Sequence, residues 1–136
     1  MTETHLPNLL GDPNATQITA GDTAAEFLPN FGMIGVSLKK DDIEALRRVD
    51  NLIVAAAANR TVGIPFLFPF ANRLADFRYE VAGRGVTLPP HALVLRYDEN
   101  GLPMHGLMWP HLKWDIADVS DSALLARLDW SHPQGL

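Results

Sequence analysis

The sequence predicts an all-β protein built as an antiparallel β-sandwich or barrel. Short apolar segments recur at fairly even spacing along the chain, and clusters of glycine, proline, asparagine and aspartate separate them. A proline-punctuated apolar run at 63–74 interrupts this pattern without forming a helix, because Pro65 and Pro69 lack a backbone donor and fix φ. Neither repeats nor heptads nor low-complexity segments are present.

The individual strands follow from apolar segments that flank turn residues. Gly21-Asp22 and Ala82-Gly83-Arg84 are the hairpin turns, and Asp98-Glu-Asn-Gly101 is a further turn cluster. The expected strands are 16–20, 24–28, 31–38, 77–81, 85–88, 92–97, 113–119 and 123–130.

The stretch 41–58 allows two interpretations. One is a helix over 41–51, capped by Asp41 or Asp42, with Ile43, Leu46 and Val49 on one face. The other is a strand plus a short helix that runs into 52–58. Both predict a helical turn somewhere in 41–58.

Composition limits the class of protein. The chain has 136 residues, enough for one domain with its own core, which we place at 16–136 after a loose lead-in at 1–15. Its net charge of −5 and lack of a basic cluster argue against nucleic acid as a partner. Without cysteine it has no disulfide and no thiolate metal site. No apolar run is long enough to cross a membrane, and no leader peptide is visible, so we expect a cytoplasmic protein.

The run at 63–74 is the most informative feature. In an extended segment, Phe66, Phe68 and Phe70 fall on one side and Arg73 on the other. We therefore expect a rigid strip that buries three aromatic rings in the core and turns one cation toward a ligand. The isomer of the Phe68–Pro69 bond is not readable from sequence, although cis is plausible there.

The order of motifs along the chain resembles the aldose 1-epimerase (galactose mutarotase) family. These motifs are the run Gly63-Ile-Pro-Phe-Leu-Phe-Pro-Phe-Ala-Asn-Arg73, the hairpin at 77–86 and Met104-His-Gly106, with Trp109 and Trp114 following. The match extends from about Ile18 to Trp130.

The resemblance implies a β-sandwich of the galactose mutarotase type that binds a hexose monosaccharide on its concave face and interconverts its α and β anomers. No metal and no other cofactor is implied. Arg73 and His105 correspond to sugar-binding groups. The family's acid histidine and base glutamate come later in the chain, so we expect them beyond residue 136 and interpret the sequence as an N-terminal half.

Each candidate binding residue also has a structural explanation. Arg73 offers a planar fork of donors to sugar hydroxyls, or its stem covers apolar surface. His105 can donate and accept, or is simply a half-buried histidine. The Asn72 side chain forms hydrogen bonds either to a sugar or to nearby backbone groups. Trp109 stacks on a sugar face or packs in the core. His105 and His111 have no third ligand at useful spacing, so we predict no metal site.

Two further alternatives concern function. A hexose 6-phosphate substrate would need more cations near the site, and only Arg60 and Arg78 stand close to Arg73 in sequence. The missing acid and base motivate a second hypothesis, a non-catalytic sugar-binding or interaction module with the same sandwich fold.

The end of the chain predicts an association. Leu124, Leu125 and Leu128 indicate a buried strand, and no later segment pairs with its edge. We expect a missing C-terminal half or self-association to cover that edge. A third hypothesis for the chain is that it is a truncated product without activity.

Overall fold

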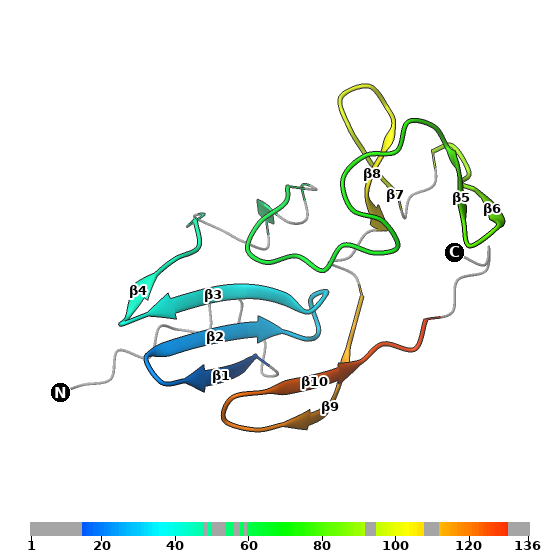
Figure 1. Cartoon of the computed structure of the whole chain (residues 1–136). Helices are drawn as coiled ribbons and strands as arrows, with labels where there is room; N and C mark the ends of the chain where they lie inside the picture. The colour runs from blue at the N-terminus through cyan, green and yellow to red at the C-terminus, as the bar shows by residue number, and fades with distance from the viewer. Residues whose placement is uncertain are drawn as a thin grey trace. The chain divides into compact units, whose positions relative to one another are not determined.

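The computed structural model describes residues 15–47, 49, 54–55, 58, 60–91, 95–107 and 112–130. By its internal contacts the chain divides into two compact units. Unit 1 comprises Met1–Phe66 and Pro110–Leu128, and unit 2 comprises Leu67–Trp109 and Asp129–Leu136. Each unit is described by itself (Figure 1). The assignment of 16–136 to one domain stays a prediction.

Unit 1 contains a four-stranded antiparallel sheet in the order β1-β2-β3-β4 and a separate hairpin made of β9 and β10 (Figure 1). Their bounds are β1 Thr16–Ala20, β2 Thr23–Leu28, β3 Ile34–Lys40, β4 Ile43–Glu44, β9 Asp115–Val119 and β10 Leu124–Arg127. The hairpin between β1 and β2 turns at Gly21, which has a φ of 59°. The predicted strands and turns are recovered here, although β3 begins and ends later than expected.

A backbone bridge joins the proline-rich run to strand β3 of the unit 1 sheet. Gly35 of β3 and Ile64 exchange two hydrogen bonds, of 2.9 and 2.8 Å. Gly63 has a φ of 61°, and a Cβ there would overlap the carbonyl oxygen of Gly35. The close approach of the two backbones therefore requires glycine at 63.

The helix predicted over 41–51 is wrong, and the alternative of a strand followed by a short helical turn is confirmed. Asp41 and Asp42 adopt left-handed φ values of 48° and 63°, so they turn the chain from β3 into β4. A left-handed pair cannot start a right-handed helix. The helical turn comes later, where Ala58 N–H donates to the Val54 carbonyl at 3.0 Å.

Unit 2 contains two antiparallel hairpins (Figure 1). The first pairs β5 (Arg78–Val81) with β6 (Arg84–Thr87), as predicted, and the second pairs β7 (Leu95–Tyr97) with β8 (Pro103–Leu107). Leu88 and Leu95 are buried at the centre of its core. The partly buried residues that pack on them are Phe70, Leu74, Phe77, Tyr79, Val86, Tyr97 and Trp130.

The strip of three phenylalanines is only partly buried, which corrects the expectation from sequence. Phe66 is 45% exposed and Phe68 is 38% exposed, whereas Phe70 packs against the core of unit 2. The segment is extended, as predicted, and its Phe68–Pro69 bond is cis.

Each of the three rings instead meets one other aromatic ring edge-on. In unit 1 the centroids of Phe66 and Trp114 are 4.9 Å apart. In unit 2 Phe68 contacts Trp130 at 5.1 Å, and Phe70 contacts Tyr79 at 5.8 Å. Alternation predicted that the rings share a side of the strip but not that Phe66 and Phe68 stay partly exposed.

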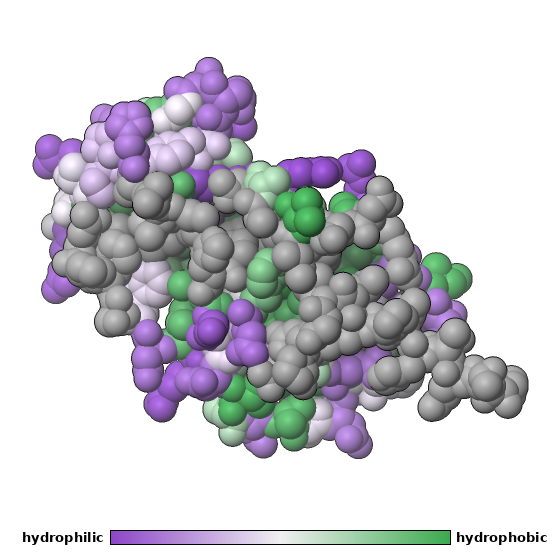
Figure 2. Space-filling view, turned by 180° about the vertical axis from the view of Figure 1, so that it is seen from behind, coloured by the Kyte–Doolittle hydropathy of each residue, from purple (hydrophilic) through white to green (hydrophobic). Residues whose placement is uncertain are grey.

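The strand predicted to be buried at 123–130 is also more exposed than expected. Leu125 is 62% exposed, while Leu124 is half-buried, so β10 has one covered and one open face. Among the described strands, β10 pairs only with β9. Several apolar side chains reach the surface on the face shown in Figure 2. Over the residues that the structure describes, no helix has the length and hydropathy that a membrane crossing requires.

Candidate functional site

The predicted site residues of unit 2 come together because the end of the proline-rich run pairs with β8. Arg73 and Met104 form an antiparallel bridge. Leu74 N–H donates to the Pro103 carbonyl at 2.8 Å, and His105 N–H donates to the Asn72 carbonyl at 2.7 Å. This pairing places Arg73 and His105 on adjacent extended segments. β8 was not predicted from sequence, because a proline opens it and it lacks an alternating pattern.

The imidazole of His105 is held in one tautomer by the backbone. Its Nδ1 accepts the N–H of Asn72 at 3.1 Å. Burial lowers the pKa of His105, and the positive charges of Arg96 and Arg73 lower it further. The ring is therefore neutral near pH 7, with its proton on Nε2. Nε2 has no acceptor among the residues described, so its N–H is available to a ligand.

Left-handed backbone conformations shape this site. Asn72, His105 and Gly106 have φ values of 58°, 62° and 74°. Asparagine tolerates this region better than most residues, which explains the residue type at 72 without a side-chain contact. A Cβ at Gly106 would lie 2.5 Å from the carbonyl carbon of Phe68 and closer still to its oxygen. Glycine at 106 therefore permits this close approach of the two backbones.

The guanidinium of Arg73 is held by two carboxylates on the turn between β7 and β8. Its Nη1 donates to Asp98 Oδ2 at 3.0 Å and to Glu99 Oε1 at 3.2 Å. The hydrogen bond and the charge of Glu99, followed by the charge of Asp98, raise the pKa of Arg73. The Arg73 side chain remains 47% exposed, so one face of the cation is still open to solvent.

Asp98 organises the turn that carries this ion pair. Its Oδ1 accepts the backbone N–H groups of Asn100 and Leu102, both at 2.9 Å, while Oδ2 accepts Arg73. The bond from Leu102 is the main reason that the pKa of Asp98 is lowered. The carboxylate is fully covered, although the exposed Glu99 beside it is not. The sequence predicted this turn. It did not predict the contact of Asp98 with Arg73, because that contact forms only when the chain folds.

The arrangement supplies donors rather than an acid and base pair. A fixed guanidinium and a neutral imidazole N–H both donate hydrogen bonds, which suits the oxygens of neighbouring hydroxyl groups. Asp98 and Glu99 are engaged by Arg73 and by the turn backbone, so neither carboxylate is placed as a free base. Within the described ranges, histidine, aspartate and glutamate form no cluster of three that could hold a metal ion.

The four predicted binding residues differ in what the structure shows. Arg73, His105 and Asn72 are brought together, with Asn72 contributing its backbone N–H and carbonyl. Trp109 lies outside the described residues, as does His111. Trp114 packs on Phe66 in unit 1. A direct contact of any of them with sugar stays a prediction.

Known proteins of similar structure identify the fold. Neither a protein-family model nor a curated protein sequence matches the chain. A galactose mutarotase-like protein from Clostridium acetobutylicum is similar with a TM-score of 0.65 and 19% identity, over 89% of this chain and 36% of that protein. A candidate aldose 1-epimerase from Escherichia coli K12 is similar with a TM-score of 0.56 and 24% identity, over 81% of this chain and 34% of that protein.

The chain thus spans about a third of the length of these two proteins. At this level of identity the likeness concerns the fold and not the chemistry. It agrees with the resemblance seen in the motifs of the sequence, and the chain has an all-β, galactose mutarotase-like fold.

Proposed function

We propose that this chain binds a free aldose through Arg73 and His105, as part of an isomerase of the aldose 1-epimerase type. The observation that carries the proposal is the fixed, neutral imidazole of His105 beside the anchored guanidinium of Arg73. The galactose mutarotase-like fold supports a sugar as the ligand.

The reaction would interconvert the α and β anomers. A base removes the proton of the anomeric hydroxyl while an acid protonates the ring oxygen, and the C1–O bond of the ring breaks. Rotation about C1–C2 and closure on the other face give the second anomer, and both protons return to their donors. Arg73 and His105 would hold sugar oxygens during these steps, because each presents donors in a fixed direction.

His105 suits a binding role better than the role of general acid. A neutral imidazole that donates from Nε2 is a weak acid, and its Nδ1 is occupied by Asn72. The acid and base of the proposed isomerase would come from sequence beyond residue 136. A sugar-binding module without catalysis remains an outcome of the test below.

The first measurement is the binding of D-galactose and D-glucose to the 136-residue chain by saturation-transfer NMR. Arg73→Gln and His105→Asn should each weaken binding about tenfold, which is typical when a hydrogen bond to a charged or buried group is lost. Asparagine at 105 tolerates the left-handed φ, so this variant preserves the backbone. Arg84→Gln, at an exposed arginine of β6, is the control and should bind like the parent.

The second measurement is polarimetry. The chain alone should not accelerate mutarotation above the buffer rate, whereas a longer protein that carries it should. Loss of sugar binding in the two variants with no mutarotation by any longer form would support the binding module. Unchanged binding in both variants would show that Arg73 and His105 do not contact the sugar.

A further inference from the structure

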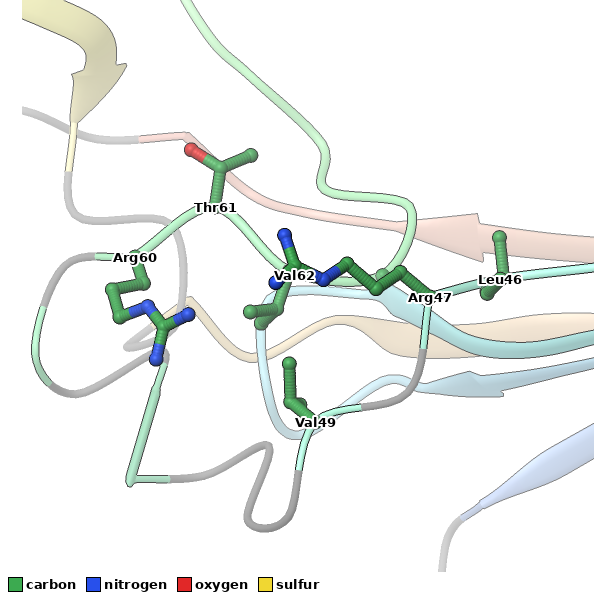
Figure 3. A pocket seen from close by; sticks show the side chains of 7 residues that line it. Leu46, Arg47, Val49, Arg60, Thr61 and Val62 are labelled. Carbon is green, nitrogen blue, oxygen red and sulfur yellow. The ribbon is translucent and has the colours of Figure 1, made fainter.

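Unit 1 contains a pocket with two arginines that the proposed sugar site does not use. Its volume is about 160 Å³, more than ten times what a single water needs. Figure 3 shows the Arg47 side chain extending toward Val62 and the Arg60 side chain on the other side of Val62, while the Thr61 hydroxyl points away. The pocket is lined by Leu46, Arg47, Val49, Arg60, Thr61, Val62 and Gly63.

Arg47 is placed by a carboxylate that fixes the backbone just before it. Glu44 Oε1 accepts the N–H groups of Leu38 and Leu46, each at 3.0 Å, and its Oε2 accepts the Ser37 hydroxyl at 2.6 Å. These bonds tie the segment after β4 to β3. The Glu44 carboxylate therefore holds the segment after β4 against β3.

Arg60 is placed by two backbone contacts on the other wall of the pocket. Its N–H donates to the Ala55 carbonyl at 2.9 Å, which closes the helical turn. Shortly after it, Ile64 is bridged to Gly35 by two hydrogen bonds. Both arginines therefore project from backbone that is held against the same sheet.

The two guanidiniums have no counter-charge in the described part of the chain. The ion pairs found there join Lys40 to Asp22, and Arg73 to Asp98 and Glu99. The guanidinium groups of Arg47 and Arg60 take part in none of them, and no other side-chain bond of these two residues is found in that part of the chain. Two cations that line one pocket are complementary in charge to an oxyanion bound between them.

We propose that this pocket of unit 1 binds a phosphate group through Arg47 and Arg60. Guanidinium groups present paired donors that match the oxygens of phosphate, and two of them can hold one tetrahedral group from opposite sides. The group could be free inorganic phosphate or the phosphate of a phosphorylated sugar, because the recognition chemistry is shared. This proposal stands independently of the sugar site in unit 2.

Isothermal titration of the 136-residue chain with inorganic phosphate, at constant chloride, tests the site. Arg47→Gln and Arg60→Gln should each weaken binding about tenfold, and the double variant should abolish it. Arg47→Lys keeps the positive charge but loses the paired donors of the guanidinium, so its loss of phosphate affinity should be intermediate. Arg127→Gln, an exposed arginine of β10 in the same unit, is the matched control and should bind as the parent does. Phosphate should also raise the melting temperature of the parent but not of the double variant.

Several outcomes separate the alternatives. Equal binding of phosphate by the parent and the double variant would overturn the proposal, as would the absence of binding up to about 10 mM phosphate. Titration with glucose 6-phosphate and with glucose shows whether the bound phosphate group is free or belongs to a phosphorylated sugar. Glucose 6-phosphate that binds more tightly than phosphate, with the binding of both lost in the double variant, would indicate a phosphorylated sugar.

Discussion

Replacing Gly106 by alanine should destabilise unit 2 more than the same replacement at Gly83. Both glycines have a φ of 74°, so both variants put a Cβ into the same unfavourable backbone region. At Gly83 nothing lies within 4 Å of the new atom, whereas at Gly106 it overlaps the peptide group of Phe68. The pair of variants therefore separates the cost of the close approach from the cost of the conformation.

The size of the difference follows from these two terms. Alanine at positive φ costs about 1–2 kcal/mol, partly offset by about 0.4–1 kcal/mol from a less flexible unfolded chain. Gly83→Ala should thus lose about 1 kcal/mol of unfolding free energy. Gly106→Ala adds about 1–3 kcal/mol for forced displacement of packed atoms. Phe68 cannot move away freely, because Pro69 fixes the next φ and the Phe68 ring contacts Trp130.

Urea unfolding followed by tryptophan fluorescence measures both variants. With a slope of about 1–3 kcal/mol per molar, the midpoint of Gly106→Ala should lie about 1 M below that of Gly83→Ala. Sugar binding should weaken only in Gly106→Ala, because the displacement includes the neighbouring His105. Equal midpoints for the two variants would refute the close approach of Gly106 to Phe68 and the site geometry built on it.

Three other predictions concern single contacts. Asp98→Asn retains the Oδ1 acceptor for the turn but sets an amide against the Arg73 guanidinium. Sugar affinity measured by NMR should therefore fall, while the melting temperature should change little. Unchanged affinity would show that the ion pair does not position Arg73. The folded pKa of His105 lies below its ordinary 6.5, so its neutral form favours the folded state. That contribution is complete above pH 6.5 and is lost as pH falls through the folded pKa, so sugar binding should weaken in that acidic range, and His105→Asn should remove the dependence. Glu44→Gln replaces an acceptor of three bonds, one from the Ser37 hydroxyl, and should cost about 1–2 kcal/mol in thermal unfolding, whereas an unchanged melting temperature would contradict its anchoring role.

The turns and hairpins of this chain could be predicted from sequence because their information is local. Gly21 and Gly83 supply positive φ between alternating segments, and the hairpins form at those positions. The strand β8 could not be predicted in this way. It is specified by pairing with Asn72–Leu74 far earlier in the chain, and its own residues, proline, histidine and glycine, have no strand preference.

The candidate site shows the same division between local and tertiary information. Arg73 and His105 were found because their residue types and motif order are visible in the sequence. The ion pair of Arg73 with Asp98 was not, because Asp98 reads as an ordinary first residue of a turn and its second role appears only when the hairpin packs beside the run. Similarly, alternation could not tell that the rings of Phe66 and Phe68 remain partly exposed.

The backbone, more than the side chains, fixes the geometry at His105. Its own N–H, the N–H and carbonyl of Asn72, and the peptide of Phe68 against Gly106 determine where the imidazole lies. Because Nδ1 is bound to a main-chain donor, no side-chain replacement elsewhere can change the tautomer without moving the paired segments. A binding group held in this way loses little conformational entropy when a ligand arrives, which favours both the geometry and the strength of its hydrogen bond. The same pairing makes the site sensitive to substitutions such as Gly106→Ala that add no polar group, which is why a glycine tests it more sharply than the histidine beside it.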